Sequence, residues 1–342
     1  GITQSTLANI NARPNTNFNI LTIMRICRGL EISFTDFFDS PLFDINNIDE
    51  LNQFFEEFRH EFENGEEKKA ADMLAQLLED LESHIEVSAA GEVDARGNIT
   101  LAAGGETSAI SINHVMEYYI YAYYYKPDWN VNVTNIPIGE YYRTHGELCI
   151  RLGRYKEGAE SFKKAICWNL VDLDAILGLG ECYRNLNMLD RYFIVTKQAY
   201  RYCCTRATMA RYYRNMGFYY TSRYKPEVAR ACYIYSNIYY KTENADNELK
   251  FLEEALHDNT PDLSIADMQD IFNQEGIEPG PSSDTIGVIY RVGELMMEDK
   301  EYTLARDCFA IVYDITREKE LEPVLDELEK AINQGNTLSG EE

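Results

Sequence analysis

The stretch YYRTHGELCIRLGRYKEGAESFKKAICWN, residues 141–169, decides the fold of this chain. It has two amphipathic halves, with Gly146 in the first and Gly158 in the second. We interpret the halves as antiparallel helices, because a small residue on each helix lets the two backbones approach closely. Phe162, four positions after Gly158, is then expected to fill the groove between the helices. The stretch therefore predicts a helical hairpin.

The same pattern recurs three times, each time with a glycine at the place of Gly146: Gly180 in residues 176–200, Gly217 in 212–236 and Gly293 in 289–313. The second copy departs from the pattern, because Tyr192 replaces the small residue of its second helix and Thr196 replaces the aromatic one. One hairpin cannot bury its apolar face alone, so neighbouring copies are expected to stack. An internal repeat of this length indicates a solenoid-like array.

These copies resemble the tetratricopeptide repeat in the order and spacing of their small and aromatic residues. The resemblance implies an all-α fold, a right-handed superhelix of antiparallel helical hairpins, over residues 112–334. Together with the Tyr-rich segment NHVMEYYIYAYYYKPDW, the first three copies resemble an uncharacterised family of bacterial tetratricopeptide proteins over residues 113–256. That resemblance implies no known activity.

The segments that flank the array differ in composition. Residues 46–85 predict an acidic helical hairpin that turns at Asn64-Gly65. Residues 86–111 are rich in Gly and Ala and indicate either a flexible insert or a short β-hairpin. Residues 335–342 are expected to form a disordered tail.

The charge of the chain is strongly negative, with 57 acidic against 32 basic residues and a formal net charge of -25. Such a surface repels phosphate backbones, so the body of the protein is not expected to bind nucleic acid. Residues 1–45 are nearly neutral, with three arginines against four carboxylates. If the chain contains a part that reads DNA, the charge distribution allows it only in residues 1–45.

The segment 1–45 begins with GITQSTLANI, followed by a polar loop and the apolar stretch ILTIMRICRGL. It resembles the second half of a helix-turn-helix domain of the Cro and phage-repressor type. The resemblance implies that Gln4, Ser5 and Asn9 face base edges in the major groove, where an amide suits adenine. Residues of the following loop, Arg13 and Asn15, would contact phosphate.

The first two helices of that domain are absent, so we expect this chain to be a fragment of a longer regulator that does not bind DNA well by itself. The alternative is an N-terminal extension that packs on the array.

Patterns that carry enzyme chemistry are not found in the sequence. The five His residues show no known metal-ligand spacing, and no Ser-His-Asp set or carboxylate pair is recognisable. The eight Cys residues form no CxxC pair, which favours free buried thiols in a reducing cytoplasm. No apolar run is long enough for a membrane helix. We expect a cytoplasmic protein without enzymatic activity, cofactor, metal or membrane association.

A binding face is the more credible functional site. In tetratricopeptide arrays the first helix of each hairpin lines the concave surface. On this chain those positions carry basic, amide and aromatic residues: Arg143, Glu147, Glu181, Arg184, Asn185, Arg214, Asn215, Phe218, Tyr290 and Arg291. Arginine forks onto carboxylates, so a short acidic or C-terminal peptide is the expected ligand. The alternative is that inner-face Arg and Glu residues pair with one another across adjacent helices.

Two functions follow from this organisation. The first is a transcriptional regulator in which a protein or peptide ligand of the array controls a DNA-reading head, an arrangement that resembles the peptide-sensing regulators of Gram-positive bacteria. The second is a protein-interaction scaffold without DNA-binding activity. The sequence leaves a homodimer open as an alternative to a monomer.

Overall fold

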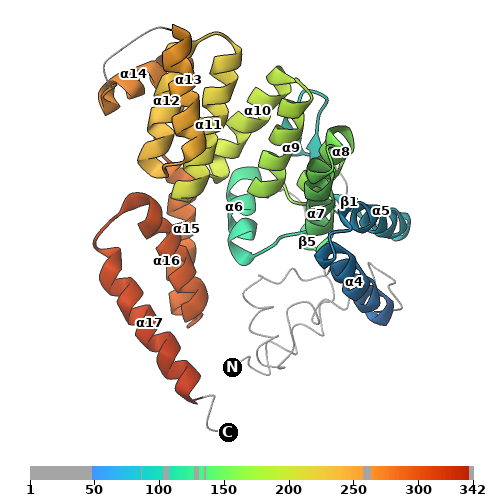
Figure 1. Ribbon diagram of the computed structural model, residues 1–342. Coiled ribbons are helices and arrows are strands. Elements are labelled where there is room, and N and C mark those ends of the chain that lie inside the picture. The colour runs from blue at the N-terminus through green and yellow to red at the C-terminus, as the bar shows by residue number, and fades with distance from the viewer. Residues whose placement is uncertain are drawn as a thin grey trace. The chain divides into compact units, whose positions relative to one another are not determined.

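The computed structural model describes residues 48–85, 87–102, 108–126, 131–134, 136–256 and 263–338 (Figure 1). These residues are mainly helical, and consecutive helices pack in pairs, which confirms the predicted all-α fold class. The expected helix-turn-helix segment lies outside the described residues, and so do its predicted DNA-facing residues: Gln4, Ser5, Asn9, Arg13 and Asn15.

The chain divides into two compact units, and the boundary falls inside one helix, after Cys182. The first unit contains the described residues up to that boundary except 95–98. Its elements are α4 (Ile48–Glu63), α5 (Glu67–His84), β1 (Ser88–Ala89), β2 (Gly91–Val93), β3 (Ile99–Leu101), β4 (Ser108–Ile110), α6 (Val115–Tyr125), β5 (Val131–Val133), α7 (Ile138–Arg151), α8 (Tyr155–Trp168) and the larger part of α9 (Leu173–Asn185). The boundary falls within residues 112–334, over which the sequence analysis predicts one array.

The second unit contains residues 95–98 and those from Tyr183 onward. Its elements are the end of α9, α10 (Leu189–Ala199), the 3₁₀ turn η1 (Tyr200–Tyr202), α11 (Arg206–Ser222), α12 (Pro226–Tyr239), α13 (Glu243–Leu256), α14 (Ile265–Glu275), α15 (Ser283–Glu298), α16 (Tyr302–Thr316) and α17 (Leu321–Leu338). Within this unit α11, α12 and α13 lie side by side (Figure 1).

Local signals explain where several helices start. Thr205, directly before α11, and Thr208, in its first turn, form a capping box in which each side chain accepts a hydrogen bond from the backbone N–H of the other. Pro226 occupies the first turn of α12, where its missing N–H costs no hydrogen bond. Ser264 and Asp267 form a second capping box at the start of α14, and Gly276, directly after the last residue of this helix, has the left-handed conformation.

The insert between the acidic hairpin α4–α5 and helix α6 contains short strands. β2 and β3 form an antiparallel hairpin in which Gly91 pairs with Leu101 and Val93 with Ile99. β1, β4 and β5 form a separate parallel sheet in the order β1-β4-β5. The hairpin is one of the two forms expected for residues 86–111, whereas the parallel sheet is a feature that the sequence analysis did not anticipate.

A glycine of one helix faces an aromatic ring of the next in three helix pairs. A Cβ placed on Gly146 of α7 would lie 2.8 Å from the ring of Phe162 in α8. On Gly217 of α11 it would lie 2.9 Å from the ring of Tyr233 in α12, and on Gly293 of α15 it would lie 3.0 Å from Phe309 in α16. Each ring is 2% exposed or less. The backbones can therefore approach closely only because these helices carry glycine.

The second copy of the pattern is built differently. Gly178 of α9 faces an aromatic ring, and that ring is again Phe162. Tyr192 of α10 is buried, and its hydroxyl donates a 3.0 Å hydrogen bond to the carbonyl of Asn215 in α11. The ring of Tyr192 also meets Phe218 edge-on, at 5.6 Å between centroids. The bulky residue at this place thus links α10 to α11.

Tyrosines fill much of the core of the second unit. Tyr213 is fully buried, and its hydroxyl donates to the carbonyl of Glu278 and accepts from the N–H of Gly280, both at 2.8 Å. Its neighbour Tyr212 is equally buried, but its hydroxyl has no hydrogen-bond partner among the described residues. Tyr121 of α6, in the first unit, has a hydroxyl of the same kind. Burial raises the pKa of both phenols, that of Tyr121 to about 12.

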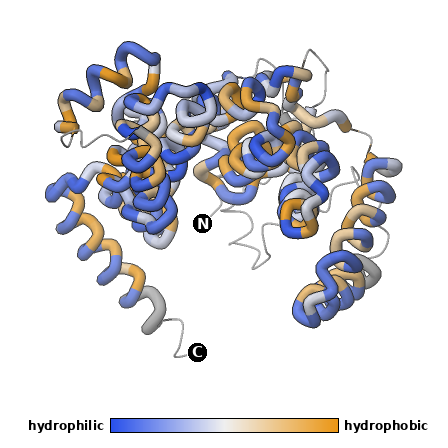
Figure 2. The backbone as a smooth tube through the Cα atoms, turned by 45° about the horizontal axis from the view of Figure 1, so that its top comes forward, coloured by the Kyte–Doolittle hydropathy of each residue, from blue (hydrophilic) through white to orange (hydrophobic). Residues whose placement is uncertain are grey.

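The last helix is amphipathic, and polar and apolar residues alternate along it in Figure 2. Leu321 and Leu328 of α17 are buried, and the helix packs on α16. It continues to Leu338 and so includes residues 335–338, which the sequence analysis assigns to a disordered tail. Among the described residues, no helix has the length and apolar content needed to cross a membrane.

The glycine–ring contacts predict opposite outcomes for two Gly→Ala substitutions in the second unit. Gly217→Ala should lower the free energy of unfolding, because overpacking against Tyr233 costs about 1–3 kcal/mol and exceeds the gain in helix propensity. Gly287→Ala, in the interior of α15 with open space around the new methyl group, should raise it by roughly 0.5–1 kcal/mol. Thermal or urea unfolding of both variants measures the difference. Equal effects would contradict the role of the Gly217 contact.

Candidate functional site

The residues predicted to line a concave face belong to four helices and to both units. The first unit holds Arg143 and Glu147 on α7 and Glu181 on α9. The second unit holds the remaining seven: Arg184 and Asn185 at the end of α9, Arg214, Asn215 and Phe218 on α11, and Tyr290 and Arg291 on α15. They are therefore considered unit by unit.

In the first unit Arg143 is already paired. Its guanidinium lies 3.7 Å from a carboxylate oxygen of Asp172 and 3.4 Å from one of Asp174. A third carboxylate, Glu140, lies 3.8 Å away on the same helix. The alternative considered in the sequence analysis, pairing between inner-face charges of adjacent helices, describes this residue.

Asp172 is the buried partner in that network. One of its oxygens accepts the N–H of Ala175 at 3.0 Å and so caps the start of α9. The other oxygen accepts from the side chain of Asn113 at 3.3 Å. Burial raises the pKa of Asp172 to about 6, against the opposing effect of Arg143. Burial likewise raises the pKa of Glu147.

In the second unit one face of α11 carries a row of residues at helical spacing, Arg211, Arg214, Asn215 and Phe218, which we call the α11 stripe. Phe218 is half-buried, and the guanidinium of Arg184 lies over its ring at 5.4 Å from the centroid. Tyr192 meets the same ring edge-on. The stripe is therefore cationic and ends in an aromatic ring that two neighbours hold in place.

Arg214 is the unusual member of the stripe. Its Nη1 is buried and has no hydrogen-bond partner within the part of the chain that the structure describes. Burial lowers the pKa of this guanidinium, and the charge of Arg211 lowers it further. Both effects disfavour the charged form of the Arg214 guanidinium, and a carboxylate bound next to it would stabilise that form.

The two α15 residues make contacts within their own helix pair. Arg291 forms an ion pair with Glu294 at 2.8 Å, and its side chain is 60% exposed. Tyr290 meets the ring of Phe309 edge-on at 5.4 Å. Arg143 and Arg291 thus have carboxylate partners, whereas Nη1 of Arg214 has no hydrogen-bond partner among the described residues.

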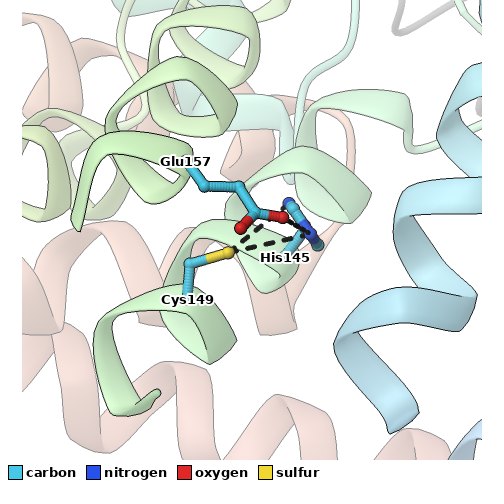
Figure 3. Close-up of side chains that lie close together, drawn as sticks. All are labelled: His145, Cys149 and Glu157. Atoms are coloured by element: carbon cyan, nitrogen blue, oxygen red, sulfur yellow. Dashed lines mark hydrogen bonds and ion pairs between the residues drawn. The ribbon is translucent and has the colours of Figure 1, made fainter. Parts of the chain in front are cut away.

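A second polar group lies in the hairpin α7–α8 of the first unit (Figure 3). His145 and Cys149 are one helical turn apart on α7, and Glu157 reaches them from the first turn of α8. The Nε2 atom of His145 lies 3.6 Å from Oε1 of Glu157 and 3.7 Å from Sγ of Cys149. The ligand atoms of the three residues all lie within 4.8 Å of one another.

Burial and hydrogen bonding fix the state of this group. His145 is 4% exposed and Cys149 is fully buried, whereas the carboxylate of Glu157 is half-exposed. The Nδ1 atom of His145 shares a 2.7 Å hydrogen bond with Oγ of Ser161, one turn after Glu157 on α8. Burial lowers the pKa of His145 and raises that of Cys149 to about 12. At neutral pH the imidazole and the thiol are therefore both uncharged.

A cavity of about 430 Å³ opens beside the imidazole of His145. Its wall includes Glu157 and Ser161 from α8 and the carboxylates of Glu79 and Glu82 from α5. Glu82 accepts hydrogen bonds from Tyr142 and from Lys164. Burial alone would raise the pKa of Glu82, but the hydrogen bonds from Lys164 and Tyr142 outweigh this effect and hold the pKa below its usual range. The cavity gives small solutes a path to His145.

The sequence analysis did not single out this group. His145 and Cys149 are spaced i, i+4, as are Glu157 and Ser161, so each pair lies on one helix face. The two faces meet only when the helices fold into a hairpin with the correct rotation. A search for i, i+4 pairs of ligand-type residues on both arms of one hairpin is the signal that identifies it.

No protein-family model matches the chain, and a search of curated proteins finds no match to it.

The pKa of Asp172 predicts a pH dependence. A carboxyl group whose folded pKa lies above its unfolded value stabilises the fold most below pH 3.8, and that contribution is lost as pH rises through about 6. Asp172→Asn keeps an oxygen that can cap α9 but does not titrate. Relative to the wild type, the variant should therefore gain stability as pH rises from 4 to 7, a window set by these two pKa values.

Urea unfolding of both proteins at several pH values measures that difference. A constant difference across the window would contradict the raised pKa. Asp174→Asn is the matched control, since its exposed carboxylate pairs with the same Arg143.

Proposed function

We propose that this chain is a non-enzymatic interaction protein whose α11 stripe, together with Arg184, binds an anionic segment of a protein or peptide. The observation that carries the proposal is the buried Nη1 of Arg214, which has no partner among the described residues. A buried charged donor without a partner costs free energy that a bound carboxylate recovers. The array of helix pairs, which resembles tetratricopeptide repeats in sequence, supports the same assignment.

The chemistry of the stripe specifies the ligand class. A guanidinium donates two parallel hydrogen bonds to a carboxylate, and the amide of Asn215 is suited to pair with a peptide backbone. Phe218 offers an ordered aromatic surface beside these groups, because Arg184 and Tyr192 contact its ring. A peptide that carries a carboxylate next to an apolar residue fits this arrangement.

Net charge makes the stripe selective. The chain carries -25 overall, so most of its surface repels an acidic segment and a cationic row attracts it. The ligand is therefore expected to bind in one place and with a strong dependence on ionic strength.

The proposal extends to transcriptional regulation through the head at residues 1–45. Support for this part comes from the helix-turn-helix resemblance of that segment and from its near-neutral charge within an acidic chain. In the competing scaffold function, the array binds its partner and the N-terminal segment does not read DNA.

Substitution of Arg214 tests the binding site. Peptides selected from a random phage-displayed library on the full chain should be enriched in Asp, Glu or a free C-terminal carboxylate. Their affinity, measured by fluorescence anisotropy, should fall roughly 10- to 100-fold in Arg214→Gln, because a charge-assisted hydrogen bond is lost. The same variant should unfold at or above the wild-type temperature, since it removes Nη1, a buried donor with no partner among the described residues.

Arg291→Gln is the matched control, because that arginine is exposed and pairs with Glu294 on its own helix. Two results would contradict the α11 stripe as the binding site. One is a set of selected peptides without acidic groups, and the other is equal affinity for the wild type and Arg214→Gln. Arg184→Ala and Asn215→Ala should each weaken binding without unfolding the protein.

The DNA-reading part is tested separately. The chain is expressed together with any coding sequence that precedes residue 1, and its binding to genomic DNA fragments is measured over a range of salt concentrations. Sequence-selective, salt-sensitive binding supports the regulator. Binding that an unrelated DNA abolishes equally well, or no binding, supports the scaffold.

A further inference from the structure

We propose that His145, Cys149 and Glu157 form a binding site for a zinc ion that joins α7 to α8. The site is independent of the α11 stripe and lies in the other unit. The donor set consists of one imidazole, one sulfur and one carboxylate, which are the three ligand types that Zn²⁺ takes from proteins. The same set disfavours Mg²⁺ and Ca²⁺, which prefer oxygen ligands throughout.

The distances between the donor atoms suit a tetrahedral ion. With a Zn–N bond of about 2.05 Å, a Zn–S bond of about 2.3 Å and a Zn–O bond of about 2.1 Å, nitrogen and sulfur lie about 3.6 Å apart, and nitrogen and oxygen about 3.4 Å apart. The corresponding distances from Nε2 of His145 are 3.7 Å to Cys149 and 3.6 Å to Glu157. Sγ of Cys149 also lies 3.9 Å from Nδ1, so the thiol lies against the imidazole ring. The Cys149 side chain must turn toward the lone pair of Nε2 for the three donors to surround one ion.

Ser161 orients the imidazole for this role. Its Oγ lies 2.7 Å from Nδ1 of His145, so Nδ1 can donate its proton there and leave the lone pair of Nε2 for the ion. A hydrogen bond of this kind to the second ring nitrogen is the usual partner of a metal-bound histidine. It comes from α8, the helix that also carries Glu157.

The surroundings permit access and charge compensation. The 430 Å³ cavity beside His145 has room for the ion to enter and for a water molecule as fourth ligand. Arg154 lies 3.8 Å from the second oxygen of Glu157, but it is held by Asp72 at 2.9 Å. Oε1 of Glu157, the oxygen that faces His145, remains available to the ion.

Cobalt titration of the full chain tests the site, because Co²⁺ replaces Zn²⁺ and reports thiolate ligation by a charge-transfer absorption band. We expect one equivalent of Co²⁺ to produce this band and Zn²⁺ to displace it. Cys149→Ser should abolish the band, whereas Cys182→Ser should retain it, although Cys182 is a buried thiol close to the same hairpin through Gly158.

Exposed residues provide a test that does not depend on core substitutions. Glu157→Gln should weaken Co²⁺ binding at least about tenfold, a loss typical of altered metal environments. Glu160→Gln, which removes another carboxylate of the cavity wall, should leave it unchanged. Circular dichroism establishes that each variant is folded, and if Cys149→Ser is not, the two glutamate variants decide.

Two results would overturn the proposal. The first is Co²⁺ binding without the thiolate band in the wild type, since that indicates surface carboxylates only. The second is equal affinity in Glu157→Gln and Glu160→Gln.

Discussion

The contact between a helical glycine and an aromatic ring sets the distance between paired helices in both units. Phe162 of α8 occupies the space that side chains at Gly146 and Gly178 would fill, so its ring packs directly against both α7 and α9. Tyr233 and Phe309 do the same for their own pairs. The groups that give the chain chemical character depend on this spacing, because His145 adjoins Gly146, and the α11 stripe flanks Gly217. A wider separation would part Cys149 from Glu157.

The helices could be predicted from the sequence because the spacing of glycine and aromatic residues and the turn residues that define them lie close together in the chain. Glycine and aromatic spacing identifies α7–α8, α11–α12 and α15–α16, and Asn64-Gly65 marks the turn between α4 and α5. The parallel sheet of β1, β4 and β5 has no such signal. Its strands have only two or three residues, too few for a periodic pattern, and their partners lie far apart in the sequence.

The residue types on the first helix of each hairpin show where charged side chains lie, but they do not show which of them form ion pairs. Arg143 and Arg214 occupy the same kind of place in their copies, yet Arg143 meets the acidic start of α9 while Arg214 meets Arg211. Asp172, directly before α9, and Asp174, in its first turn, are the partners of Arg143, and only the folded chain brings them to it. The group around His145 was likewise hidden, because its donors come from two helices whose rotation no pattern specifies.

The ionisation of the buried hydroxyls of Tyr121 and Tyr212 gives an absorbance signal that reports whether the core around them is closed. A phenol without a partner in the core ionises only after water reaches it, and the phenolate absorbs at longer wavelength than the phenol. In alkaline solution these two tyrosines should ionise with the kinetics of local opening. Absorbance after a jump in pH therefore follows the local opening that exposes these tyrosines, without any added label.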